Sequence, residues 1–169
     1  MVSSGVQQPR WLNETEAGAW RGLQLMQMRL TARLARELAA DSCLSYPDYV
    51  VLVALTEQPE GALRVFELAA MLGWEKSRLS HQLRRMESRG LVTKQRCGTD
   101  RRGAVAAVSA KGRQEIEKAA PGHVAAVRRF FVDLLSEEQL RVLASVSQAV
   151  LAALAAEEAG RDDGVGPSQ

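Results

Sequence analysis

The central stretch Arg64–Arg102 constrains the fold of this chain most, because it strings together an apolar segment, a glycine, an arginine-rich segment and two β-forming segments. Apolar residues at helical spacing predict a short helix over Val65–Leu72. Gly73 is suited to end that helix in the left-handed conformation. A second helix is expected over Glu75–Arg89. Two helices joined by so short a turn form a helix-turn-helix.

Two short segments follow the second helix, Leu91–Arg96 and Ala104–Val108. They are rich in Val, Thr and Ala and flank a glycine-bounded turn, so they predict a β-hairpin. The turn carries Asp100, Arg101 and Arg102. Arginine at such a tip can enter the minor groove of DNA, where the negative potential is strong. Asp100 is expected to accept hydrogen bonds from a neighbouring arginine and so orient it.

The second helix has two chemically distinct faces. On a helical wheel, Leu79, Leu83 and Met86 fall together and are predicted to face the core, with Glu87 near the edge of that face. The opposite face carries hydrogen-bond donors with almost no acidic group, and duplex DNA presents acceptors along its grooves and backbone. The residues predicted to contact DNA are Lys76, Ser77, Arg78, Ser80, His81, Arg84, Arg85, Arg96, Arg101 and Arg102.

The net charge of +2 hides a strong asymmetry along the chain. Residues 64–113 hold twelve Lys or Arg against four Asp or Glu, whereas the remainder holds ten against sixteen. A basic block between acidic flanks favours one surface made for a polyanion. A solvated charged surface that binds nothing remains the alternative, which charge by itself does not exclude.

The N-terminal part predicts two further helices. Residues 1–12 are expected to be disordered. Asn13 with Glu16 forms a capping-box pattern, which predicts a long helix to about Ala40. Ser45-Tyr46-Pro47-Asp48 starts the next helix, which is apolar and is expected to be buried. Gln58-Pro59-Glu60-Gly61 ends it.

The C-terminal part also predicts two helices. Ser109 caps the first, which runs to Phe131 or Leu135 with a kink at Pro121. Ser136 opens the last, which ends near Ala156, and residues 158–169 form a disordered tail. The apolar residues that seek a partner surface are Phe130, Phe131, Leu134, Leu140, Leu143 and Val150. A homodimer would supply that surface, and the alternative is that these helices fold back on their own lobe.

Several motifs in this order carry a family resemblance. They are Leu68-Ala69, Leu72-Gly73, Ser77-Arg78-Leu79-Ser80, Leu83, Met86-Glu87, Arg89-Gly90-Leu91-Val92, Asp100-Arg101-Arg102 and Val108-Ser109-Ala110-Lys111-Gly112. Over about Leu23–Leu154 the chain resembles the MarR (multiple-antibiotic-resistance regulator) family of winged-helix transcription regulators. The resemblance implies a mainly α fold with a small β-hairpin wing, in which residues 43–109 form the DNA-binding lobe. Residues 13–42 and 110–157 would form the dimerisation helices.

The resemblance also implies a function and its partners. The chain is expected to regulate transcription, as a repressor, by binding a pseudo-palindromic double-stranded operator as a homodimer. Residues 76–89 would lie in the major groove and Arg102 in the minor groove. Many relatives release DNA when a small molecule binds, so an effector of unidentified chemistry is a further expected partner. The sequence departs from the family pattern at Glu75, His81 and Arg64, which bears on the base contacts and not on the mode of binding.

Other classes of function are less well supported. No phosphate loop, GxSxG elbow or HExxH helix is found, and the two histidines lack metal-ligand spacing, so neither an enzyme, a cofactor nor a metal is predicted. A winged-helix protein-interaction module and a non-specific architectural DNA binder remain as alternatives.

The location expected for the chain is the bacterial or archaeal cytoplasm. The longest uninterrupted apolar run, Ala149–Ala156, is too short to span a bilayer, and no secretion signal is recognised. Cys43 and Cys97 are too few for a disulfide framework. Redox sensing by either cysteine is not expected. Trp20 and Met28 on the first helix are expected in the core, with a ligand pocket as the alternative.

Overall fold

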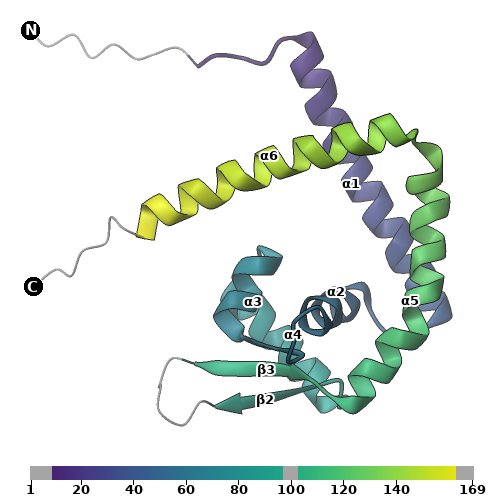
Figure 1. Ribbon diagram of the computed structural model, residues 1–169, viewed down its shortest axis with the longest axis vertical. Helices are drawn as coiled ribbons and strands as arrows, with labels where there is room; N and C mark the ends of the chain where they lie inside the picture. Colours follow the sequence, from purple (N-terminus) through teal and green to yellow (C-terminus); the bar gives the residue numbers. More distant parts are fainter. Residues whose placement is uncertain (1–8, 97–102, 163–169) are drawn as a thin grey trace, which may run out of the picture. The chain divides into compact units, whose positions relative to one another are not determined.

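The computed structural model describes residues 9–96 and 103–162 and divides the chain into two compact units, Met1–Ala126 and Val127–Gln169. It is mainly helical with one small sheet, as predicted (Figure 1). Its helices are α1 (Glu14–Asp41), α2 (Tyr46–Thr56), α3 (Val65–Leu72), α4 (Lys76–Ser88), α5 (Ala110–Phe130), the 3₁₀ helix η1 (Val132–Leu134) and α6 (Glu137–Asp162). Its strands are β1 (Ala62–Arg64), β2 (Val92–Arg96) and β3 (Ala104–Val108).

The predicted helix starts are confirmed at atomic detail. The Asn13 side chain accepts from the Glu16 backbone N–H, and the Glu16 carboxylate accepts from the Asn13 backbone N–H, both at 2.9 Å. Ser45 and Asp48 form the same reciprocal pair at the start of α2. Each box satisfies backbone donors that the first helical turn leaves without a partner, so the helices begin where the sequence predicts.

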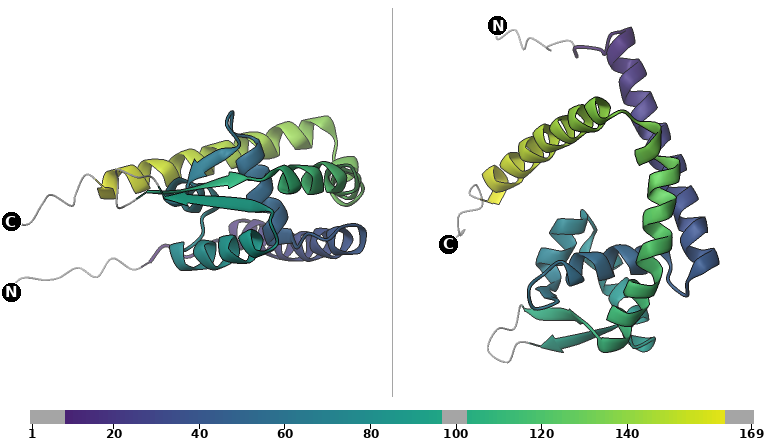
Figure 2. Two further views of the ribbon diagram at one scale, coloured as in Figure 1. Left: turned by 90° about the horizontal axis from the view of Figure 1, so that it is seen from below. Right: turned by 45° about the vertical axis from the view of Figure 1, so that its right-hand side comes forward.

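The sheet contains one strand that the sequence analysis missed. The predicted hairpin of β2 and β3 forms, with Val92 opposite Val108, but β3 also pairs antiparallel with β1, in the order β1-β3-β2. β1 has three residues, too few to show an alternating pattern. Gly61, at φ +65°, turns the chain into this strand. Figure 2 shows β2 and β3 running side by side.

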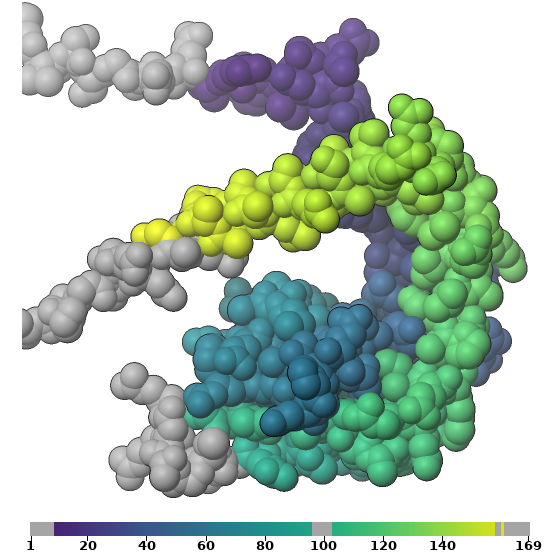
Figure 3. All heavy atoms as spheres, viewed as in Figure 1, coloured from purple at the N-terminus to yellow at the C-terminus, as the bar shows by residue number. Residues whose placement is uncertain are grey.

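The core lies where α2, α3 and α4 pack on the sheet. Leucines from each of these three helices are fully buried, together with Met86 of α4 and Ala106 of β3. Leu34 and Leu38 are the buried residues of α1. In the space-filling view the blue and teal atoms of α2 and α3 form a closely packed body (Figure 3). This core fixes which faces of α3 and α4 remain outside.

The start of α5 packs tightly against the end of α4. The Ser109 side chain accepts from the Gly112 backbone N–H at 2.9 Å, which confirms Ser109 as the cap. A Cβ atom on Gly112 would lie 2.0 Å from the Leu91 carbonyl oxygen, so only glycine fits there. Pro121 lies inside α5, and the helix continues through it to Phe130.

The second unit contains η1 and α6. Ser136 opens α6 as predicted, accepting from the Gln139 backbone N–H at 3.2 Å. The helix extends past the predicted end at Ala156 to Asp162, and 163–169 lie outside the described residues. By length and composition, Glu137–Glu157 is apolar enough to cross a membrane, with a mean hydropathy of 1.4. The prediction from the sequence rested on uninterrupted apolar runs, whereas polar residues such as Ser145 and Gln148 interrupt this segment.

Candidate nucleic-acid interface

Helix α4 presents one face to the core and one to solvent, largely as the wheel predicts. Leu79, Leu83 and Met86 are fully buried. A fourth inward residue, Gln82, is buried and was not predicted. Glu87, predicted near the core edge, is exposed instead.

The outward face gathers most of the predicted contact residues on one helix. Lys76, Ser77, Arg78, His81, Arg84 and Arg85 are exposed, and Ser80 is half-buried. Among the described residues, Lys76, Arg84 and Arg85 form no salt bridge with any carboxylate. Their charges are therefore free to meet an external polyanion. Glu75 is the N-cap of α4 but its side chain makes no capping hydrogen bond.

The predicted contact residues of the hairpin are only partly described. Arg96 is seen as the last residue of β2, and its side chain is not described. Asp100, Arg101 and Arg102 lie outside the described residues, so their predicted roles stay predictions. The strands that flank this turn, β2 and β3, are both described, and β2 contacts α4 (Figure 1).

A buried carboxylate that the sequence analysis missed connects α2 to α4. Asp48 is only 1% exposed. It accepts from Gln82 Nε2 and Arg89 Nη1, both at 2.6 Å, and from the Ser45 backbone N–H at 2.9 Å. Arg89 also donates from Nη2 to the Cys43 carbonyl oxygen. Asp48 was predicted only as a helix-start residue, since nothing local shows that residues 34 and 41 positions away reach it.

The pKa of Asp48 reflects two opposed effects. Burial raises the pKa of this carboxyl, but the hydrogen bonds from Arg89 and Ser45 outweigh burial and leave the pKa below its ordinary value of 3.8. Asp48 is therefore ionised at neutral pH. The hydrogen bond that Arg89 donates to Asp48 raises the pKa of Arg89 in turn. The ion pair holds the C-terminal end of α4 against the start of α2.

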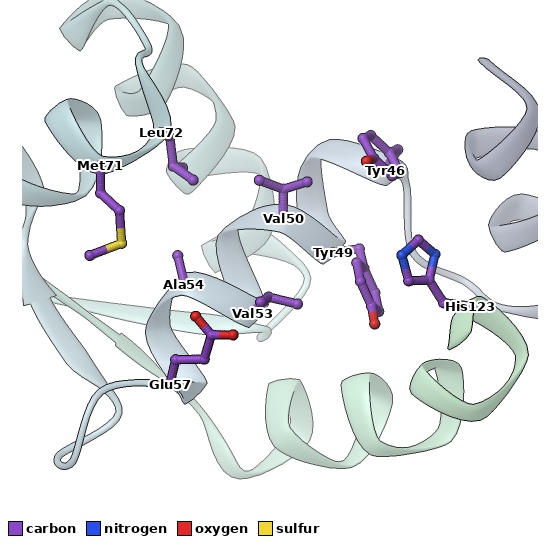
Figure 4. A pocket seen from close by; sticks show the side chains of 9 residues that line it. All are labelled: Tyr46, Tyr49, Val50, Val53, Ala54, Glu57, Met71, Leu72 and His123. Carbon is purple, nitrogen blue, oxygen red and sulfur yellow. The ribbon is translucent and has the colours of Figure 1, made fainter. Parts of the chain in front are cut away.

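A pocket of about 260 Å³ lies beside α2, within the first unit (Figure 4). Its lining combines three aromatic rings with aliphatic side chains and one carboxylate: Tyr46, Tyr49, Val50, Val53, Ala54, Glu57, Met71, Leu72 and His123. The Tyr49 and His123 rings are 4.4 Å apart between centroids. Burial lowers the pKa of His123 and raises the pKa of Tyr49, so both are neutral near pH 7.

Two expectations about single residues can be compared with the structure. Trp20 and Met28, expected in the core, are 54% and 65% exposed and line a shallow groove on α1.

The Cys43 thiol donates to Glu115 Oε2 at 2.9 Å. That hydrogen bond, together with burial, raises the pKa of Cys43 and keeps it a thiol, which argues against redox sensing there. Cys97 lies outside the described residues.

Comparison with known proteins supports the resemblance seen in the sequence. A sequence model of the MarR family matches residues 44–103. The crystal structure of AbsC, a MarR family transcriptional regulator from Streptomyces coelicolor, is 39% identical. The match covers 88% of this chain and 99% of AbsC, with a TM-score of 0.80. A search of curated proteins gives no match.

Two further solved structures contain DNA. Sco3205, a MarR family transcriptional regulator from Streptomyces coelicolor solved in complex with DNA, is 36% identical with a TM-score of 0.80. That match covers 86% of this chain and 91% of Sco3205. A mutant MarR from E. coli complexed with operator DNA is 17% identical, has a TM-score of 0.71, and covers 84% of this chain and 99% of that one. The predicted winged helix-turn-helix fold is therefore confirmed.

Proposed function

This chain belongs to the MarR family of DNA-binding transcription regulators, and from that premise we propose that it is a repressor acting on a pseudo-palindromic operator. In this proposal, residues 43–109 form the DNA-binding lobe, with α4 in the major groove and the hairpin tip in the minor groove. Residues 13–42 and 110–157 form the dimerisation region. The protein acts in the cytoplasm, where its DNA is.

One observation carries the proposal: the outward face of α4 concentrates hydrogen-bond donors that no carboxylate among the described residues neutralises. Arg84 and Arg85 are exposed cationic side chains on this face, and Ser77 and His81 add further exposed polar side chains. DNA phosphates and guanine edges accept hydrogen bonds from such groups. A protein-interaction module would instead be expected to present aromatic anchors here.

Dimerisation supplies the second half of the operator contact. α1 and α6 expose large apolar side chains, among them Trp20, Met28, Val146, Val150 and Leu151. Exposed apolar surface of this extent favours association with another apolar surface. A two-fold axis would then put the two α4 helices about 34–36 Å apart, one turn of the duplex.

We further propose that the pocket beside α2 takes a small aromatic effector (Figure 4). Its aromatic and aliphatic lining suits a flat apolar body, and Glu57 and His123 add polar groups to that lining. Thermal-shift screening of small aromatic compounds tests this assignment. The assignment fails if no compound that stabilises the protein also releases it from DNA.

Selection of genomic fragments by the purified protein tests the central proposal. We expect a pseudo-palindromic sequence bound about 10³-fold more tightly than random duplex. Arg84→Ala and Arg102→Ala should each weaken binding and reduce the salt slope by about 0.9 if each arginine contacts one phosphate. Lys118→Ala is a matched control, since Lys118 lies on α5 and pairs with Glu115. Equal affinity of all variants for the selected site would exclude this placement of the contacts.

A further inference from the structure

The turn between α3 and α4 holds a tryptophan in a fixed position. Gly73 adopts the left-handed conformation, and the Trp74 backbone N–H donates to the Ala69 carbonyl oxygen at 2.9 Å. The half-buried Trp74 side chain packs against the hydrophobic core. Both the backbone and the ring of Trp74 are therefore anchored to the lobe.

Arg78 lies over this ring. Its Cζ atom is 4.3 Å from the centre of the Trp74 ring, within the range of a cation–π contact. Stacking engages the flat face of the guanidinium and leaves the N–H groups at its edge free to donate. Arg78 is exposed and forms no salt bridge with a described carboxylate, so those donors face solvent.

The position of Arg78 in α4 suggests what its contact with Trp74 does. Arg78 belongs to the first turn of α4, and in a helix-turn-helix the N-terminal residues of the second helix contact base edges. Arg84 and Arg85 lie further along α4 and have no stacking partner among the described residues. A flexible arginine side chain can bind a phosphate group in many orientations. A bidentate contact with guanine O6 and N7 requires the guanidinium group to be held in one orientation.

We infer that Trp74 is a positioning residue that holds Arg78 to recognise one guanine in the major groove, so that specificity at that base pair depends on Trp74. The inference rests on the proposed function. Without the ring, Arg78 would have to lose its side-chain freedom on binding, which weakens the correct complex by about twofold to tenfold. Contacts to phosphate elsewhere would be unchanged.

The test uses a duplex that the wild-type protein selects from a randomised library, together with versions of it carrying each single base-pair change. Arg78→Ala should lose discrimination at one G·C pair, by about fivefold to a hundredfold. Trp74→Leu should reduce discrimination at that same pair, and Trp74→Phe, which keeps an aromatic face, should restore most of it. In the Arg78→Ala background, Trp74→Leu should add no further loss.

A merely structural role for Trp74 gives a different result. Trp74→Leu would then lower the thermal midpoint and weaken all duplexes equally, and its cost would add to that of Arg78→Ala. Uniform weakening of all duplexes, or a cost that adds to that of Arg78→Ala, overturns the inference. If Trp74→Leu does not fold, Trp74→Met takes its place, because Met fills apolar volume without an aromatic face, and equal discrimination by Trp74→Met and wild type at that base pair overturns the inference. Arg78→Lys, which keeps the charge but loses the guanidinium fork, should lose discrimination at the same base pair.

The two proposals fail in distinguishable ways. If the wild-type protein enriches no sequence, the proposed function is wrong and the inference is wrong with it. If it enriches a sequence but Arg78→Ala keeps full discrimination at every base pair, only the inference is wrong.

Discussion

Protonation of His123 would place a positive charge in a buried site. Its Nδ1 atom is buried and has no hydrogen-bond partner among the described residues, and its ring packs on Tyr49 (Figure 4). No described acidic partner compensates a positive charge at that atom. Burial therefore lowers the pKa of His123 below its ordinary value of 6.5.

The sign of the resulting pH dependence follows from linkage. Between the lowered pKa and 6.5 the unfolded chain binds a proton that the folded chain does not, so stability falls as the pH drops through that window. His123→Phe keeps the ring contact and removes the titration. We expect the free energy of unfolding, measured in urea at pH 7, 6 and 5, to fall less in this variant than in wild type.

The other histidine provides the control for this measurement. His81→Ala removes the other histidine and leaves the contact between His123 and Tyr49 in place, so it is the matched variant for the same urea measurements. A His123→Phe variant that loses stability as steeply as wild type between pH 7 and pH 5 would contradict the assignment.

Between elements, the Asp48 carboxylate is the main polar connection of α2 to α4. It accepts hydrogen bonds from Gln82 inside α4 and from Arg89 at its end. Removing the charge leaves Arg89 without its ionic partner, although Arg89 keeps its hydrogen bond to the Cys43 carbonyl oxygen and is 36% exposed to water. We expect Asp48→Asn to lower the free energy of unfolding by about 1–3 kcal/mol.

The pH dependence of this loss has a defined sign. Because the pKa of Asp48 is below 3.8 in the folded state, its contribution is present above that pH and is lost as the pH falls through the folded-state pKa. The stability difference between wild type and Asp48→Asn should therefore shrink in acid. Asp133→Asn breaks the exposed pair with Arg128 and should cost less than about 1 kcal/mol. If both variants lost the same free energy of unfolding at pH 7, the proposed stabilisation by the buried Asp48 carboxylate would be disproved.

At the scale of the whole molecule, α6 exposes an apolar face. Val146, Val150 and Leu154 are each more than half exposed, and the segment is apolar enough to suit either a second protein surface or a bilayer. Membership of a DNA-binding family favours the protein surface. The segment also contains the polar residues Ser145, Ser147 and Gln148, which suit a helix with one solvent-exposed face.

Charge introduced into this face should separate the protomers. Val150→Glu would place a carboxylate in the proposed interface, so we expect a monomer by analytical ultracentrifugation and about a hundredfold or greater loss of operator affinity. Gln148→Glu, on the opposite side of α6, should leave the dimer intact. A wild-type monomer that cosediments with phospholipid vesicles would show that a bilayer covers this face instead.

Local patterns were sufficient to predict most elements of this protein. The capping boxes at Asn13 and Ser45, the left-handed Gly73 and the apolar stripe of α4 each depend on residues within one or two turns of one another. Such interactions are encoded in neighbouring residues, so they can be recognised before the chain is folded. The outward donors of α4 followed from the same stripe, because the face opposite a buried one is exposed.

Only the tertiary structure decided what depends on distant partners. β1 is a strand because β3 lies beside it, and Asp48 is a buried anchor because α4 folds onto it. Gln82 and His123 acquire their roles in the same way, through contacts with residues far away in the sequence. The physical reason is range: hydrogen-bonded turns act between neighbours, whereas burial, ion pairing and stacking depend on which surfaces the folded chain brings together.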